Sequence, residues 1–304
     1  MADIATTTEL DARIPEVWAN MVLDYLSDSM GFIKRLDFDP DADEIQQYGD
    51  TINITAPGTF TAQDKTENAA VTLQKPSDTK ISLVLNKWKE VTLSQSDLSR
   101  VFAKPKLLPK VTKGMANALI AQVAGDLVSL YSSAGLSVDA TSGDVIEKIN
   151  EARRKLVTSQ TPMSADRVGV MSEYIIEDLL NNSKLNDASK SGSTAVLREG
   201  SVGRVSGFDF YEYQGVKTSG SPATYHSMMF NPDAILLVTR ALPLDAEEMG
   251  GARQSAVTDP ETGLTVRITM SYQAGFLAPQ ITCDILYGVK VLRANQIVDF
   301  QHNA

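Results

Sequence analysis

The feature that most limits the fold of this 304-residue chain is a long extended segment that has no core of its own. From residue 49 to about residue 88, apolar residues alternate with polar ones on both sides of a polar stretch at 59–68. Alternation with a period of two is typical of strands with one buried face, so the segment predicts a long hairpin over 49–88. A two-stranded hairpin alone is only marginally stable in water. Its apolar face is therefore expected to lie on another surface, such as a neighbouring copy of the chain.

An amphipathic helix is predicted before this hairpin, over residues 14–30. Pro15 suits its first turn and Gly31 its C-terminal end. The flanking residues 1–13 and 37–50 are mostly polar or acidic, so the helix is expected to act as an arm that docks at a distance. Its apolar stripe is formed by Ile14, Val17, Trp18, Met21, Val22, Tyr25, Leu26 and Met30.

The middle of the chain predicts a mixed α/β domain. A short helix is allowed at 93–102, and a helix of some 25 residues, about 37 Å long, is expected between Pro109 and Gly135. Another helix follows from Thr141, where Thr141-x-x-Asp144 resembles a capping box. A buried strand at 168–170, a helix at 175–180 and a strand at 208–213 complete this part.

Two long strands are expected near the C-terminus. Asn231-Pro232-Asp233 is interpreted as a helix start before the apolar run 234–238. A strand with strict alternation then covers 264–272, and a second strand runs from about 281 to 291 before the chain returns to its end.

Composition excludes several classes of protein. One cysteine, Cys283, cannot form an internal disulfide, and with only two histidines the chain lacks the ligands for structural zinc or an iron–sulfur cluster. The longest apolar run is far too short to cross a bilayer. A net charge of −10 and a pI near 4.8 argue against a dedicated nucleic-acid binder. The chain is therefore expected in the cytoplasm of the cell that makes it.

No chemical motif is convincing. Asp37, Asp39, Asp41 and Asp43 alternate as in a calcium loop, but the positions for its Gly and Glu hold Ala42 and Tyr48. A solvated acidic linker is the better interpretation. Ser77-x-x-Lys80 matches a serine–lysine nucleophile motif, but the companion motifs are absent.

The remaining candidate residues have ordinary structural interpretations. His226 is expected to be a packed or hydrogen-bonded strand histidine, and His302 to lie in a frayed terminal tail. Cys283 is expected to be a buried, inert thiol. Trp18 and Trp88 are interpreted as anchors of the arm and of the hairpin base. No catalytic, cofactor-binding or metal-binding residue is assigned, and no enzymatic activity is expected.

Four local segments, in this order, resemble those of the major capsid proteins of tailed phages with the Hong Kong 97 phage fold, and in particular the coat proteins of short-tailed phages. The resemblance covers nearly the whole chain. The segments are Gly49-Asp50-Thr51-Ile52-Asn53-Ile54, Gly203-Arg204-Val205-Ser206-Gly207-Phe208-Asp209-Phe210-Tyr211, Thr262-Gly263-Leu264-Thr265-Val266-Arg267-Ile268 and Asp284-Ile285-Leu286-Tyr287-Gly288-Val289.

The resemblance implies an α+β fold with five parts: an N-terminal arm (1–48), an extended hairpin or E-loop (49–88), a P-domain with a spine helix (89–140), an A-domain (141–240) and return strands of the P-domain (241–304). It also implies self-assembly into hexamers and pentamers of an icosahedral virion capsid that encloses double-stranded DNA without sequence-specific binding. A scaffolding protein, a portal protein and a decoration or cement protein are the implied partners, and assembly takes place in the host cytoplasm. Because only residues 1–13 precede the first helix, the scaffold is expected to be a separate protein. Contacts between subunits are expected at Trp18, Tyr25, Ile52, Ile54, Ile81, Leu83 and Trp88.

Three other functions compete with this interpretation. A cellular nanocompartment shell of the same fold is the nearest alternative, distinguished by whether its particles contain DNA or an enzyme. A hydrolase that uses Ser77 and Lys80 would be a monomer active on esters. A tail or fibre component would be expected to show fibrous repeats, which the sequence lacks.

Overall fold

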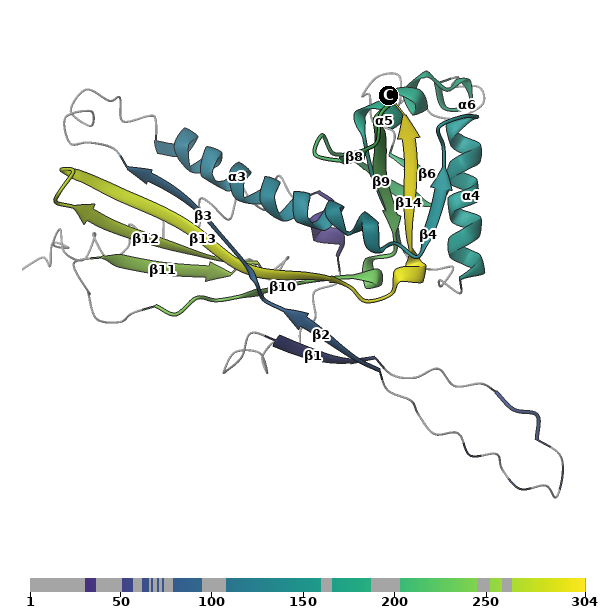
Figure 1. Cartoon of the computed structure of the whole chain (residues 1–304), viewed down its shortest axis with the longest axis horizontal. Helices are drawn as coiled ribbons and strands as arrows, with labels where there is room; N and C mark the ends of the chain where they lie inside the picture. Colours follow the sequence, from purple (N-terminus) through teal and green to yellow (C-terminus); the bar gives the residue numbers. More distant parts are fainter. Residues whose placement is uncertain are drawn as a thin grey trace, which may run out of the picture.

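The computed structural model describes residues 31–36, 51–56, 62–65, 67, 70, 73, 79–94, 108–159, 166–186, 203–244, 252–258 and 264–303. The expected arm helix at 14–30, with Trp18 and Tyr25, lies outside these residues. The described chain forms two sheets, a long helix that runs along one of them towards the other, and a two-stranded stem that projects away from both (Figure 1).

One sheet has five strands and is elongated. Its order is β10 (Ile235–Arg240), β13 (Ala278–Val291), β12 (Thr265–Gln273) and β11 (Arg253–Thr258), and β3 (Lys87–Ser94) also pairs with β13. All of these pairs are antiparallel. Helix α3 (Leu108–Val128) covers one face of this sheet and continues into the 3-10 helix η4 (Ser129–Ser133). We call the five-stranded sheet with α3 the five-stranded body.

The other sheet has seven strands and carries the shorter helices. Its order is β4 (Leu136–Asp139), β14 (Ile297–Asn303), β9 (Thr224–Phe230), β5 (Arg167–Met171), β7 (Phe208–Glu212) and β6 (Arg204–Val205), with β8 (Lys217–Ser219) paired to β9. Helices α4 (Val145–Thr158), α5 (Glu173–Asn181) and α6 (Ser183–Asn186) lie beside it. We call this sheet with α4 and α5 the seven-stranded body.

Two buried clusters of apolar side chains hold the helices on the sheets and join the two bodies. In one, the buried side of α3, including Leu119 and Val123, packs on Ile268 and Cys283 of the five-stranded sheet and is continuous with Val170 and Phe230 of the other sheet. The second lies wholly within the seven-stranded body, where α4 and α5 cover the other face of its sheet. The seven-stranded sheet is therefore buried on both faces, and α3 joins the two bodies.

Within the described residues, the chain passes between the bodies where three of its segments lie close together. Short 3-10 helices η5 (Pro232–Ala234) and η7 (Ala294–Gln296) lie there, and η1 (Ile33–Arg35) packs against the same cluster as α3. Backbone hydrogen bonds connect the passing segments: Gly135 N–H donates to Ala294 O, Asn231 N–H to Gln296 O, and Leu292 N–H to Ala234 O.

Three local predictions were wrong. The run after Asn231-Pro232-Asp233 is strand β10, not a helix, because Ile235–Val238 are buried in the five-stranded sheet and only one 3-10 turn precedes them. Leu93 and Ser94 end strand β3 instead of starting a helix, because they pair with Ile281 and Gln280. The residue that caps α4 is Asp144 itself, whose carboxylate accepts from Ile146 N–H; Thr141 bonds to Asp139 instead.

Sheet membership also differs from the expected segments. β4 and β14 belong to the seven-stranded sheet, although their residues fall in the segments 89–140 and 241–304 expected for the P-domain. β10 belongs to the five-stranded sheet, although it falls in the expected A-domain segment 141–240. The parallel pairing of β14 with β4 and the antiparallel pairing of β10 with β13 impose these positions.

Candidate assembly surface

The hairpin begins with a regular antiparallel stem. Strands β1 (Thr51–Ala56) and β2 (Thr79–Val84) pair in register from Thr51 opposite Val84 to Ala56 opposite Thr79. Four residues expected to contact neighbouring subunits form two directly opposed pairs, Ile52 with Leu83 and Ile54 with Ile81. The backbone register brings these four positions together in the stem, whose two strands lie side by side in Figure 1.

The base of the stem is fixed to the five-stranded sheet. Leu83, only 1% exposed, packs with Leu85 against Leu236 and Val238 of β10. The Lys290 ammonium of β13 donates to the carbonyl oxygen of Ser82 on β2. Leu83 is thus buried within its own chain. Of the four stem positions expected to contact other subunits, Ile81 is the one whose described side chain is half-buried.

A glycine permits the close approach of the stem. A Cβ atom on Gly288 of β13 would lie 2.7 Å from the carbonyl oxygen of Val84, closer than real Cβ atoms come to backbone. Any larger residue at 288 would therefore push the hairpin base away from the sheet. This glycine falls in one of the segments that carry the family resemblance, but its role depends on a contact between distant residues.

Trp88 lies just beyond the stem, at the start of β3. Its side chain is 63% exposed, and its indole N–H donates to Asp284 Oδ2 at 2.9 Å. Asp284 also holds Arg267 through two charge-assisted hydrogen bonds of 2.6 and 3.1 Å. Trp88 is therefore held by its polar edge while its ring stays accessible, which is compatible both with an anchor at the hairpin base and with a contact between subunits.

A second apolar surface was missed by the sequence analysis. At the turn between β12 and β13, Phe276 is 81% and Leu277 64% exposed, and Tyr272 at the end of β12 is also exposed. Beside this turn lies a hollow lined by Thr92, Ser94, Gln273, Phe276, Ala278 and Gln280. Adjacent Phe and Leu in the short turn between two strands are the signal that would have indicated this surface.

The spine helix is tied to the five-stranded sheet by a buried polar link. Tyr287 Oη donates to Asp126 Oδ2 at 2.6 Å, and Lys87 Nζ lies 3.1 Å from the same oxygen. Burial acts to raise the pKa of Asp126, but the hydrogen bonds from Tyr287 and Lys87 prevail and hold it below its ordinary value. Burial together with this carboxylate raises the pKa of Tyr287.

Both histidines have defined partners in the seven-stranded body. His226 Nδ1 lies 3.0 Å from both oxygens of Asp299, Nε2 lies 2.6 Å from Ser219 Oγ, and the ring stacks on Tyr131 at the end of the spine helix. The prediction of a hydrogen-bonded strand histidine is confirmed. For His302 the prediction of a frayed tail was wrong, because it lies in β14, is 8% exposed and has Nε2 3.1 Å from Asp178 Oδ2.

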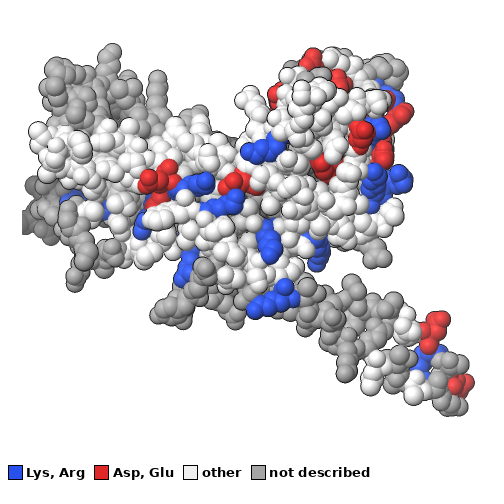
Figure 2. All heavy atoms as spheres, viewed as in Figure 1, with Lys and Arg blue, Asp and Glu red and all other residues white. Residues whose placement is uncertain are grey.

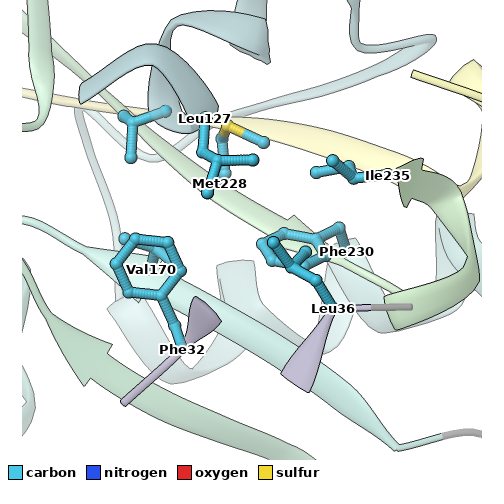
Figure 3. Close-up of a pocket in the computed structure, with 8 residues that line it drawn as sticks. Phe32, Leu36, Leu127, Val170, Met228, Phe230 and Ile235 are labelled. Atoms are coloured by element: carbon cyan, nitrogen blue, oxygen red, sulfur yellow. The ribbon is translucent and has the colours of Figure 1, made fainter. Parts of the chain in front are cut away.

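Little in the described residues suggests small-molecule chemistry. A cavity of about 10 Å³ lies where η1, α3 and the two sheets meet, and Figure 3 shows that apolar side chains such as Phe32, Leu127 and Phe230 surround it. This space is at most the size of one water molecule. Cys283 is buried, and burial raises the pKa of its thiol to about 12. The described parts of the chain contain no group of three or more His, Cys, Asp or Glu residues placed to hold a metal ion, and no helix there is long and apolar enough to span a membrane.

The sequence and the structure of this chain differ in how closely they resemble known proteins. No family model and no curated protein matches its sequence. Its structure, however, matches solved structures over most of its length. A structure from Mycobacterium phage Che8 is 20% identical, with a TM-score of 0.63 over 88% of this chain and 90% of the other.

Two further matches are phage capsid structures. The capsid structure of cyanophage P-SCSP1u is 11% identical, with a TM-score of 0.62 over 84% of this chain and 85% of the other. The capsid of Ralstonia phage GP4 is also 11% identical, with a TM-score of 0.60 over 90% of each chain. The chain has the fold of phage capsid proteins. This confirms the α+β, Hong Kong 97-type capsid fold predicted from the sequence.

The capsid fold gives names to the described parts. The two-stranded stem corresponds to the base of the expected E-loop, α3 to the spine helix, and the two bodies contain most of the expected P- and A-domain elements. The division of the chain into the five ranges given above stays a prediction.

Proposed function

We propose that this chain is a major capsid protein whose copies assemble into the icosahedral shell of a phage with a double-stranded DNA genome. The observation that carries the proposal is the match to phage capsid structures over about nine-tenths of this chain and of theirs. These neighbours point to a structural role.

The surfaces of the subunit support assembly. A projecting stem and the exposed turn at Phe276 and Leu277 lie on different parts of the molecule. Contacts between two different surfaces of identical copies are heterologous, and they close into rings when the rotation between copies allows it. Hexamers and pentamers are the rings that the proposal requires, with scaffolding, portal and decoration or cement proteins as further partners. Assembly would take place in the host cytoplasm and yield the virion capsid.

The direct test is particle formation. The full chain is co-expressed with the other capsid and scaffolding genes of its source, and the product is studied by analytical ultracentrifugation and negative-stain microscopy. Capsomers and closed shells are expected. A chain that stays monomeric at high concentration in the presence of these partners would contradict the proposal. DNA inside the particles supports a phage capsid, whereas an enclosed enzyme would support the nanocompartment alternative.

A matched pair of variants tests the stem. Ile81→Asp places a charge on the face shared with Ile54, whereas Val84→Asp places the same charge on the opposite face of β2. Burial of a large aliphatic side chain stabilises a contact by about 1.5–3 kcal/mol. Ile81→Asp is expected to reduce shell yield strongly while the subunit stays folded by circular dichroism, and Val84→Asp to have a smaller effect. Equal shell yields from both variants would show that this face of the stem does not bridge subunits.

A further inference from the structure

Three polar side chains of the seven-stranded body form a chain of hydrogen bonds that the proposed function does not use. Ser219 Oγ lies 2.6 Å from His226 Nε2, and His226 Nδ1 lies 3.0 Å from both carboxylate oxygens of Asp299. A serine, a histidine and an aspartate linked in this order have the geometry of the triad that activates a nucleophilic serine. Such a triad is recognised by its distances and roles, whatever the order of its residues in the sequence. We call these three residues the Ser219 triad.

The fold brings the Ser219 triad together from three strands. Ser219 is the last residue of β8, His226 lies in β9 and Asp299 lies in β14, and β9 pairs with both of the other strands (Figure 1). In the backbone register His226 is opposite Lys217 on β8 and opposite Gln301 on β14. Ser219 and Asp299 each lie two residues from these partners, and side chains two residues apart on a strand point to the same face of a sheet. All three members therefore lie on one face of the seven-stranded sheet.

The surroundings of His226 fix which of its nitrogens can take up a proton. An ionised carboxylate only accepts hydrogen bonds, so Asp299 requires a hydrogen on Nδ1 and leaves a lone pair on Nε2 towards the Ser219 hydroxyl. Gln301 Nε2 donates to Asp299 Oδ2 at 2.9 Å, and Tyr131 stacks on the imidazole with ring centroids 4.2 Å apart. His226 is 7% and Asp299 8% exposed. A buried carboxylate and an aromatic ring therefore hold the histidine in the orientation of a base for the serine.

Ser219 differs from its two partners because it is exposed. It stands directly before the turn 220–223, and the next residue, Gly220, has a φ of 78°, so the chain turns sharply after the serine. A substrate can thus reach the hydroxyl while the base stays buried behind it. Lys217 is the one charged residue of β8, and Figure 2 shows acidic and basic side chains interspersed on the part of this body in view. These surroundings favour a neutral substrate over a charged one.

We propose that Ser219 is a nucleophile that accepts the acyl group of a small, neutral ester whose leaving group departs readily. Ser219 Oγ attacks the carbonyl carbon while its proton passes to His226 Nε2, and Asp299 stabilises the imidazolium that forms. The bond between this carbon and the leaving oxygen then breaks, and His226 gives the proton to the departing alcohol. The products are an ester of Ser219 and the free alcohol. Attack of water on this ester, with the same proton transfers, releases the carboxylic acid and restores the serine.

The test is covalent labelling of the full chain, and its outcome does not depend on whether the chain forms a capsid. The purified protein is incubated with a fluorophosphonate probe, from which an activated serine displaces fluoride, and the modified peptide is located by mass spectrometry. A general base contributes about 10²–10⁴-fold to such a reaction, so Ser219 is expected to react at least about a hundred times faster than the exposed Ser221 of the same turn. With p-nitrophenyl acetate as the ester probe, a burst of about one p-nitrophenolate per chain is expected.

Matched serine variants locate the reaction. Ser219→Ala is expected to abolish both the fluorophosphonate label and the burst. Ser221→Ala, which removes an exposed hydroxyl two residues further along the chain, is expected to react like wild type. Equal labelling rates at Ser219 and Ser221, or a burst that persists in Ser219→Ala, would overturn the proposal.

Asp299 acts through His226 and is tested as a positioning residue. In Asp299→Asn the amide can donate to Nδ1 and turn the imidazole hydrogen towards the serine, so labelling is expected to slow by at least about tenfold while circular dichroism stays native. Because loss of this buried carboxylate can also destabilise the chain, the pH profile of the wild-type rate is measured as well. The titratable side chains nearest His226 are Asp299, Tyr131 and, opposite it on β8, Lys217.

The reaction needs the neutral imidazole, so the labelling rate is expected to rise with pH through one titration and then level off. A folded Asp299→Asn that reacts at the wild-type rate would contradict the triad. A wild-type rate that stays constant from about pH 5 to pH 8 would contradict it equally.

Discussion

The five-stranded and seven-stranded bodies differ in how much of each sheet is buried. The seven-stranded sheet is covered on one face by α4 and α5 and on the other by the spine-helix cluster. The five-stranded sheet is covered by the spine helix on one face, and the base of the projecting stem packs on Leu236 and Val238 at its other face. A body buried on both sides can be stable by itself, whereas a body with an open face and a long stem is suited to contacts with other molecules. In the proposed capsid, contacts between subunits are therefore expected mainly at the five-stranded body and its stem.

The substitution with the largest expected effect on the free energy of unfolding tests whether the two bodies unfold together. Phe300→Ala removes a fully buried ring from the inner cluster of the seven-stranded body and is expected to cost about 3–5 kcal/mol of unfolding free energy. Because the spine-helix cluster spans both sheets, the subunit is expected to unfold in one transition that shifts as a whole. The measurement is urea denaturation followed by circular dichroism and by tryptophan fluorescence. Two separate transitions, of which only one shifts, would show that the bodies are independent.

A pair of glycine substitutions tests the close packing of the stem. Gly288→Ala places a methyl group against the Val84 carbonyl and is expected to cost about 1–3 kcal/mol. Gly114→Ala in the spine helix meets no atom within 4 Å, so it is expected to stabilise the chain by about 0.5–1 kcal/mol. Thermal unfolding of the two variants is compared with wild type. A neutral Gly288→Ala would mean that the stem sits farther from β13 than described.

A pH series tests the link between the spine helix and the five-stranded sheet. The lowered pKa of Asp126 means that its ionised form stabilises the fold. This contribution is complete above the ordinary value of 3.8 and is lost as pH falls through the lower folded-state value. Asp126→Asn is expected to cost about 1–2 kcal/mol at pH 7, and its difference from wild type should shrink below pH 4. A difference that is constant from pH 7 to pH 3 would contradict this role.

The smallest effect concerns the first turn of α4, in the seven-stranded body. Asp144→Ala removes the N-cap and is expected to cost about 1 kcal/mol. Thr141→Ala removes only a hydroxyl bonded to Asp139 and is expected to cost less. Urea titration of both variants distinguishes them. A larger loss from Thr141→Ala would restore Thr141 as the residue that caps the helix.

The sequence predicts the elements whose periodicity is strong. Met115, Leu119 and Val123 recur at helical spacing and do lie on the buried side of the spine helix, and strict alternation located β12. Residues 235–238 form an uninterrupted apolar run, because both faces of β10 are buried there, so periodicity could not distinguish a strand from a helix. The helix prediction depended on the preceding Pro-Asp turn and was wrong.

The candidate surfaces were less predictable than the elements. Ile81 could be chosen from its alternation, but the burial of Leu83 depends on Leu236 and Val238, far away in the sequence.

In the proposed capsid, one subunit would have to fit both five-fold and six-fold rings, and the connection between its two bodies limits how it could do so. The chain crosses it near Gly135, Asn231 and Leu292, and each crossing is hydrogen-bonded to another. Within the described residues, these three hydrogen-bonded segments resist twisting of one body against the other far more than a single linker would, because twisting one segment strains the others. Differences in curvature between rings would then be absorbed by bending of the projecting stem, while each subunit keeps a nearly constant angle between its two bodies.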